Sequence, residues 1–311
     1  MLRPNLLRRS RRPKPSRRRH SPVPRTGDGS VRASGFFLLV AGAKTGYTTL
    51  SMTPAADNAY GAVSAVYDAL MADVPHNTWL RRIEAECYTR GKSPRSALDV
   101  ACGTGLATEL LHHRGYRPVV GIDLSEPMIA VAKLKAQAHG IADAVVYHAQ
   151  NAAALDLGDA RFDLAVSLFD SLNYILEPGD LARAFGRVFQ HLNPGAVFAF
   201  DVNSLYALSH ELFTQTGVSG PLSHDWRAFW DRETRTCRVE MAFTLADAHT
   251  GETRQFHETH HQRAYTTTEL REMLTDAGFV AIAVYGNYGE RSPTPKSDRI
   301  LFVAETPGAV Q

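Results

Sequence analysis

The chain has 311 residues, 44% of them hydrophobic, which is enough to bury the core of one large domain or two modest ones. Charge is unevenly spread: residues 1–51 carry twelve Lys or Arg and one acid, whereas the residues from Met52 onward carry 22 basic and 31 acidic side chains. The acidic main part disfavours a nucleic-acid partner. No run approaches the roughly 20 apolar residues of a membrane-spanning helix, so no membrane partner is expected.

Cysteine usage points to a reducing environment. Cys87, Cys102 and Cys237 lie far apart and are odd in number, which fits neither a zinc site nor a disulfide framework. We therefore expect no metal and a cytoplasmic location. The sequence carries no signal for an oligomeric state.

Residues 1–51 are basic and rich in proline, and they contain one short apolar run at 36–43 that ends in small residues. This layout resembles a secretory signal peptide, although the charged leader is long and the apolar run is short. Abundant Arg and scarce acid also suit a transit peptide or a nucleic-acid-binding arm. We favour a third interpretation, in which these residues are a disordered extension or Met52 is the true start, because Pro, Ser and Arg cannot bury enough surface to fold.

Two helices are predicted at 60–94, at the start of a domain that spans 52–311. Pro75 separates them, and the second ends near Gly91. Their apolar faces consist of Val63, Val66, Tyr67, Leu70 and Met71 in the first helix and of Trp79, Leu80, Ile83 and Cys87 in the second.

A regular alternation of apolar strands and amphipathic helices follows. The predicted strands are 97–101, 119–123, 145–148, 162–168 and 196–202, and the predicted helices are 106–113, 126–138 and 180–191. Asn193-Pro194-Gly195 is interpreted as a turn before the fifth strand. Apolar strands separated by helices indicate a parallel sheet with both faces covered, which is a doubly wound α/β domain.

The alternation breaks after Asn203 and returns with a helix at 268–277 and strands at 279–284 and 299–304. Within the break, 238–245 and 253–263 alternate as strands do around a turn at 247–251, which predicts a hairpin. We expect residues 203–265 to form an antiparallel β insertion after the fifth strand, where it can serve as a lid.

A glycine turn follows the first strand, in Ala97-Leu-Asp-Val-Ala-Cys-Gly-Thr-Gly105, at the sheet edge where this fold binds ligands. Nicotinamide enzymes use such a turn too. Here Thr108 replaces their third Gly or Ala, and Asp99 would repel a pyrophosphate but attract an ammonium group. Asp123, which ends the next strand, can accept both hydroxyls of a ribose. The turn therefore suits a nucleoside that carries a cation.

The motifs Asp99-Val-Ala-Cys-Gly-Thr-Gly105 and Gly121-Ile-Asp-Leu-Ser125 resemble class I S-adenosylmethionine-dependent methyltransferases. The likeness runs from about Tyr60 to Ala304 and is strongest to a bacterial branch of small-molecule N- and O-methyltransferases with an antiparallel insertion. It implies a Rossmann-like, doubly wound, seven-stranded sheet with strand order 3-2-1-4-5-7-6, the last strand antiparallel. It also implies the cofactor S-adenosyl-L-methionine.

The resemblance implies a set of cofactor-binding residues. Asp99 and Gly103 would face the methionyl end, Asp123 the ribose, and Leu124 and Met128 the adenine. Relatives have an Asp after the third strand; this chain has Asn151, whose oxygen can accept the same hydrogen bond. The complete set is Asp99, Ala101, Gly103, Gly105, Asp123, Leu124, Met128, Asn151 and Leu168.

Three residues are candidates for the chemistry itself. Methyl transfer from a sulfonium needs alignment and exclusion of water, and it needs a general base only where the acceptor must lose a proton. Asp170 and Asn173 follow the fourth strand and can point toward the methyl group, although Asp170 could instead cap a short helix. Tyr67 resembles a tyrosine that lies over the cofactor in sugar N-methyltransferases, although it could be a core aromatic.

The insertion supplies the candidate acceptor contacts, which are Trp226, Trp230, His257, His260, Arg263 and Tyr265. Along the strand at 253–263, His257 and Arg263 fall on one face, and Glu258, His260 and Gln262 fall on the other. A solvated strand face is the alternative, and the histidines match no familiar metal-ligand spacing.

The favoured function is therefore methylation of a small-molecule N or O acceptor. Methylation of RNA or protein is an alternative, and the acidic main part opposes RNA. An NAD-dependent oxidoreductase is disfavoured by Asp99 and Thr108. A cofactor-binding protein without catalysis is the third alternative, because displacement needs no obligatory catalytic residue.

A protein that starts at Met52 is expected to fold and to bind cofactor like the full chain, because nothing before Tyr60 has the periodicity of a core. Thermal melting and cofactor titration of the two proteins test this. A melting temperature lowered by many degrees would contradict the assignment of residues 1–51 as an extension.

Overall fold

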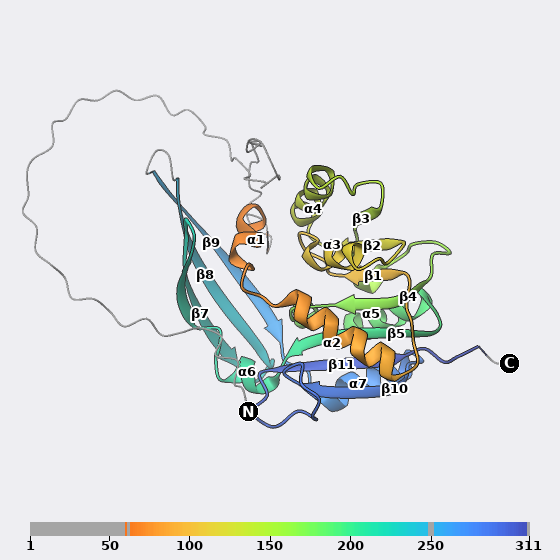
Figure 1. Cartoon of the computed structure of the whole chain (residues 1–311). Coiled ribbons are helices and arrows are strands. Elements are labelled where there is room, and N and C mark those ends of the chain that lie inside the picture. The colour runs from red at the N-terminus through yellow and green to blue at the C-terminus, as the bar shows by residue number, and fades with distance from the viewer. Residues whose placement is uncertain (1–59, 61–62, 248–251, 310–311) are drawn as a thin grey trace, which may run out of the picture. The chain divides into compact units, whose positions relative to one another are not determined.

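Residues 60, 63–247 and 252–309 are described by a computed structural model (Figure 1). The predicted extension at 1–51 and most of the predicted turn at 247–251 lie outside these residues. Within the described part of the chain, no helix is long and apolar enough to cross a membrane.

The segment ahead of the sheet is less regular than predicted. A 3₁₀-helix, η1 (Val63–Val66), leads into a single α-helical turn, α1 (Tyr67–Leu70), whose start has no side-chain cap. Its apolar residues pack against the antiparallel insertion, so the chain follows that surface instead of continuing one helix. After Pro75, α2 (His76–Thr89) buries the predicted apolar face.

The main sheet has seven strands in the order β10-β11-β5-β4-β1-β2-β3, and β11 runs antiparallel to both of its neighbours (Figure 1). Counted within the α/β domain, this is the order 3-2-1-4-5-7-6, so the predicted fold class is confirmed. The strands are β1 (Ala97–Val100), β2 (Val119–Asp123), β3 (Val145–Ala149), β4 (Phe162–Ser167), β5 (Leu192–Asn203), β10 (Val280–Gly286) and β11 (Arg299–Glu305).

Helices cover both faces of this sheet because its strands are apolar on both sides. Phe198, Phe200 and Phe302 face α5 and α7, whereas Val197 and Leu301 face α2, α3 and α4. These helices begin and end within two residues of the predicted positions. Their bounds are α3 (Leu106–His113), α4 (Glu126–Ala138), α5 (Pro178–Gln190) and α7 (Thr267–Asp276).

The predicted turn at Asn193-Pro194-Gly195 is wrong, because these residues belong to β5. Leu192 pairs with Phe162 of β4, and the Gly195 N–H donates to the Pro307 carbonyl. The register with β4 shifts just after Phe162, so the strand starts irregularly. Backbone pairing on both sides thus outweighs the turn tendency of proline and glycine.

A second, antiparallel sheet lies between β5 and α7 in the chain and has the order β6-β7-β8-β9 (Figure 1). Sequence analysis predicted β8 (Thr236–Ala246) and β9 (Thr253–Arg263) but missed the short helix α6 (Leu205–Ser209) and the strands β6 (Gln215–Ser219) and β7 (Leu222–Asp231). Only Leu222 and Ala228 of β7 are buried, so the strand lacks the apolar alternation that would reveal it.

An apolar cluster joins this second sheet to the rest of the domain. Leu222, Phe243 and Phe256 from the second sheet pack against Val63 of η1 and Met128 of α4. All five side chains are buried. The second sheet is therefore fastened to the segments that flank the glycine turn, and this places β7, β8 and β9 beside the carboxyl edge of the main sheet.

Candidate active site

The turn after β1 has the backbone that its glycines predict. Gly103 and Gly105 have φ angles of +55° and +82°, and Ala101 also has a positive φ of 57°. A Cβ atom at Gly105 would overlap the ring of Tyr147. A Cβ atom at Gly103 would lie 3.8 Å from Cε1 of Tyr67, so the tyrosine ring covers the turn.

Asp123 ties this turn to the end of β2. Its Oδ2 accepts the Gly103 N–H at 2.7 Å, and its Oδ1 accepts the Ser125 N–H at 2.8 Å. Burial raises the pKa of this carboxyl. Each oxygen retains a lone pair, which leaves acceptor capacity for a ribose. Leu124 beside it is 72% exposed, which suits an apolar surface for a base.

Asp99 is buried beneath the turn, and Thr108 holds it. The Thr108 hydroxyl donates to Asp99 Oδ2 at 2.6 Å. Burial, with a smaller contribution from the nearby Asp123 charge, raises the pKa of Asp99 to about 7. Thr108, which stands where nicotinamide enzymes have their third Gly or Ala, thus holds the Asp99 carboxylate in this site.

Asp68, which sequence analysis did not select, anchors α1 to the turn. Its two oxygens accept from the Thr104 hydroxyl and from Lys135 Nζ, both at 2.5 Å. Lys135 also donates to the Thr104 carbonyl at 3.1 Å. The Tyr67-Asp68 pair could have revealed this anchor, because Asp68 fixes the helix that carries Tyr67.

The remaining predicted cofactor residues differ in their surroundings. Leu168 is buried just after β4, and Ala101 lies in the turn itself. Asn151 Oδ1 accepts the Ala153 N–H at 2.9 Å, so part of its acceptor capacity is used locally. Met128 is 1% exposed and packs on the second sheet, so its side chain ties the two sheets together in addition to any contact with a base.

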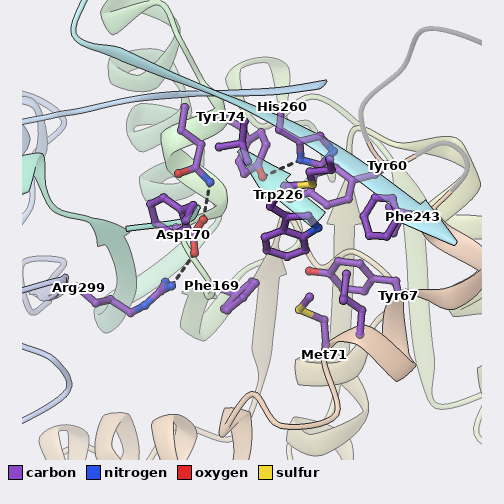
Figure 2. A pocket seen from close by; sticks show the side chains of 16 residues that line it. Tyr60, Tyr67, Met71, Phe169, Asp170, Tyr174, Trp226, Phe243, His260 and Arg299 are labelled. Carbon is purple, nitrogen blue, oxygen red and sulfur yellow. Dashed lines mark hydrogen bonds and ion pairs between the residues drawn. The ribbon is translucent and has the colours of Figure 1, made fainter. Parts of the chain in front are cut away.

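A pocket opens between the edge of the main sheet and the second sheet, and its wall is rich in aromatic side chains (Figure 2). From the predicted candidates it contains Tyr67, Asp170, Trp226 and His260. Its other labelled members were not predicted from the sequence; they are Tyr60, Met71, Phe169, Tyr174, Phe243 and Arg299.

The structure does not bring Asn173 or Tyr265 into this pocket. Asn173 is fully buried, and its amide bonds the backbone of Asn203 and the Arg263 carbonyl. Tyr265 is 3% exposed in the main core, and its hydroxyl donates to the Ile175 carbonyl. Both polar groups are occupied in joining segments of the fold, which the sequence could not indicate.

The other predicted acceptor contacts also lie elsewhere. His257 is exposed on the outer face of β9, and Arg263 donates to the Thr234 carbonyl at 3.3 Å. Trp230 packs beside Leu208, away from the pocket. The alternation of β9 follows the prediction, but the face turned to the pocket is the one with His260 and Gln262.

A buried ion network supports the floor of the pocket. Arg299 Nη2 lies 2.7 Å from Asp170 Oδ1, and Nη1 of the same side chain pairs with Asp201. Gln262 donates to the other Asp170 oxygen at 2.6 Å. Burial raises the pKa of Asp170, and Arg299 opposes this shift. Taking up a proton would weaken the ion pair of Asp170 with Arg299, so Asp170 is a poor candidate for the base.

In the described part of the chain, no group of three or more His, Cys, Asp or Glu side chains could hold a metal ion. The groups that converge at the turn are instead a buried carboxylate, a carboxylate with spare acceptor capacity, and a tyrosine ring. These fit the ammonium, the ribose and the amino-acid end of S-adenosyl-L-methionine.

Comparison with known proteins agrees with this geometry. Residues 97–195 match a family model described as a methyltransferase domain. The chain is 30% identical over 249 residues to YqeM of Bacillus subtilis, a protein named as a methyltransferase, with 79% of this chain and 96% of YqeM covered. An S-adenosylmethionine-dependent methyltransferase of Clostridium acetobutylicum superposes with a TM-score of 0.70 at 27% identity, covering 81% of this chain and all of that one.

A third relative is the dTDP-3-amino-3,4,6-trideoxy-alpha-D-glucopyranose N,N-dimethyltransferase of Streptomyces venezuelae. It is 30% identical over 228 residues, with 69% of this chain and 85% of the relative covered. The fold and these relatives define an S-adenosylmethionine-dependent methyltransferase. The chain belongs to class I of that family, in its bacterial small-molecule type, and its cofactor is S-adenosyl-L-methionine.

Replacing Asp123 by Ala is expected to weaken cofactor binding by about 1–3 kcal/mol, because the ribose hydroxyls would lose their acceptor and the Gly103 and Ser125 N–H groups that shape the turn would lose theirs. Asp123→Asn retains one acceptor oxygen and should lose less. Calorimetric titration measures both, with thermal melting as the control for folding. Unchanged affinity in both variants would remove Asp123 from the site.

Cofactor affinity is expected to rise with pH around the Asp99 pKa of about 7, because only the ionised carboxylate attracts an ammonium group. For each unit by which the bound ammonium lowers the Asp99 pKa, cofactor affinity at pH values above that pKa is about tenfold higher than at pH values below it. Titration from about pH 6 to about pH 8 measures the slope. Asp99→Asn is the matched control, because any slope that remains belongs to the cofactor's own groups.

Proposed function

We propose that this methyltransferase acts on a nitrogen or oxygen atom of a small molecule that binds in the aromatic pocket. The observation that carries the proposal is the position of Tyr67, which covers Gly103 of the cofactor turn and also lines the pocket. A molecule in this pocket would therefore lie beside the methionyl end of the cofactor.

The pocket has the composition of a small-molecule site. Apolar and aromatic side chains make up most of its wall, and a few polar groups can orient a ligand. Trp226 Nε1 is buried and has no hydrogen-bond partner among the described residues, so it is a donor available to the acceptor molecule. His260 and Gln262 supply further polar groups to the lining.

We assign the second sheet the role of a lid over the acceptor. β7, β8 and β9 contribute Trp226, Phe243 and His260 to the pocket wall. Such a cover would exclude water from the displacement and align the acceptor with the methyl group. Cofactor and acceptor would then be held by different elements, the first by β1 and β2, the second by η3 (Ser171–Tyr174) and the second sheet.

Nitrogen is supported as the acceptor atom by one relative, whose name describes an N,N-dimethyltransferase of an amino sugar. The enclosed, aromatic wall also supports a small molecule over a polymer, since RNA or a folded protein would need an open surface. The acidic main part of the chain adds to the argument against RNA.

Trp226→Phe is expected to raise the KM for the acceptor, because the loss of one hydrogen bond weakens binding by about 0.5–1.5 kcal/mol. Cofactor affinity should stay unchanged. The assay measures transfer of labelled methyl from S-adenosyl-L-methionine, first to the small-molecule fraction of a bacterial extract and then to the acceptor purified from it.

Trp230→Phe is the matched control, because Trp230 lies further along the same strand as Trp226 but does not line the pocket. If both variants change acceptor kinetics equally, the pocket is not the acceptor site. If the wild-type protein binds cofactor but methylates nothing in the small-molecule fraction, the proposed function is wrong.

A further inference from the structure

Three side chains at one wall of the pocket form a continuous hydrogen-bonded chain. The Tyr174 hydroxyl lies 2.9 Å from His260 Nδ1, and His260 Nε2 lies 2.8 Å from Glu258 Oε2. Tyr174 comes from η3 of the main domain, whereas Glu258 and His260 come from β9. Figure 2 shows the Tyr174–His260 contact at the pocket wall.

The donors and acceptors in this series of hydrogen bonds have a defined order. An ionised carboxylate only accepts hydrogen bonds, so His260 Nε2 must carry the proton that is shared with Glu258. In the neutral imidazole Nδ1 is then the acceptor, and the Tyr174 hydroxyl donates to it. Tyr174 and His260 both line the pocket, and the Tyr60 and Gln262 side chains also lie within hydrogen-bonding reach of the Tyr174 hydroxyl.

The surroundings keep His260 and Glu258 away from water, whereas Tyr174 is partly exposed. Exposure is 2% for His260 and 8% for Glu258, and the Tyr60 ring covers His260 with 4.6 Å between ring centroids. Besides His260, Glu258 accepts the Tyr60 N–H at 3.1 Å and the Val63 N–H at 2.9 Å. The carboxylate is therefore fixed in position by three donors from two segments.

We infer that Tyr174, His260 and Glu258 form a proton relay that deprotonates the methyl acceptor. This assignment rests on the proposed function. The acceptor lone pair forms the bond to the methyl carbon, and the carbon–sulfur bond breaks with its electron pair left on sulfur. The acceptor's proton passes to the Tyr174 oxygen while the Tyr174 proton passes to His260 Nδ1, and the resulting imidazolium is stabilised by Glu258.

The relay limits the class of acceptor. The reacting atom must carry a proton that it gives up, as a hydroxyl or a primary or secondary ammonium group does. A thioether has no such proton and would gain nothing from it. Asp170 is less suited to this task than the relay, because taking up a proton would weaken its ion pair with Arg299.

The charged and titratable groups around His260 are few. Glu258 lies on the same strand, Tyr174 faces it from η3, and Tyr60 faces it from the segment before η1. Asp170 and Arg299 stand beyond Gln262 and compensate one another. A change in the pH dependence of the reaction on altering His260 can therefore be assigned to the relay.

The first test needs no acceptor. Long-range ¹⁵N–¹H NMR of the histidine rings, with His260→Gln to assign the signal, reports which ring nitrogen is protonated. At the pH at which methyl transfer is assayed, we expect a ring proton on Nε2 and none on Nδ1. A proton on Nδ1 in the resting protein would overturn the relay, because Nδ1 could then accept nothing.

The second test is kinetic and uses the acceptor obtained by labelled methyl transfer to the extract fraction. Tyr174→Phe and His260→Gln are expected to lower kcat at least about 100-fold and to remove the rise of kcat with pH, with cofactor affinity unchanged. His257→Gln, on the outer face of the same strand, is the matched control and should behave as wild type.

A purely structural role for the same residues gives a different result. If these residues only held Tyr60 and Val63 in place, replacing them would lower the melting temperature without altering the pH profile. If Tyr174→Phe transfers methyl like the wild type, the relay is wrong although the proposed function stands. If the wild type transfers no methyl group at all, the proposed function fails, whatever tautomer His260 adopts.

Discussion

The pocket depends on a single buried guanidinium. Arg299 of β11 lies between Asp170 and Asp201, two carboxylates that follow or end neighbouring parallel strands. Asp201 also accepts the backbone N–H groups of Phe169 and Asp170, which both have positive φ angles of 63° and 53°. Two consecutive non-glycine residues in this region are strained, and the shared carboxylate holds them there. This bend directs η3, and with it Tyr174, toward the second sheet.

Sequence patterns could predict the parts of the fold that depend on local periodicity. Helices such as 106–113 and strands such as 119–123 lie where the apolar spacing put them, because each buries a continuous face. β7 was invisible for the opposite reason: it buries only Leu222 and Ala228. The hydrogen bond from the Gly195 N–H to the Pro307 carbonyl joins residues far apart in the sequence, and no local pattern predicts it. The start of β5 was therefore mistaken for a turn.

The cofactor turn was accessible from sequence because a turn, a strand end and its carboxylates lie within a short stretch of chain. The pocket was not, since its partners are distant in sequence: Asp170 meets Arg299, and Tyr174 meets His260. Alternation along β9 correctly separated its two faces, but it could not say which one is turned inward. That choice depends on how the second sheet packs on Val63 and Met128.

The balance of charge in the pocket bears on the acceptor. Arg299 is the one cation among the described residues that line it, and it is flanked by Asp170 and Asp201. Glu258 adds a further negative charge while His260 is neutral in the relay's resting state. Asp201 and Glu258 lie behind the lining, so the groups around the pocket carry net negative charge, which would favour a cationic ligand over a neutral one. An ammonium group would be attracted into the pocket and would then lose its proton through Tyr174 to His260. Its lone pair would therefore become available only once the acceptor is enclosed. The same carboxylates that favour binding of the cation would then stabilise the imidazolium, and this couples selection of an amine to its activation.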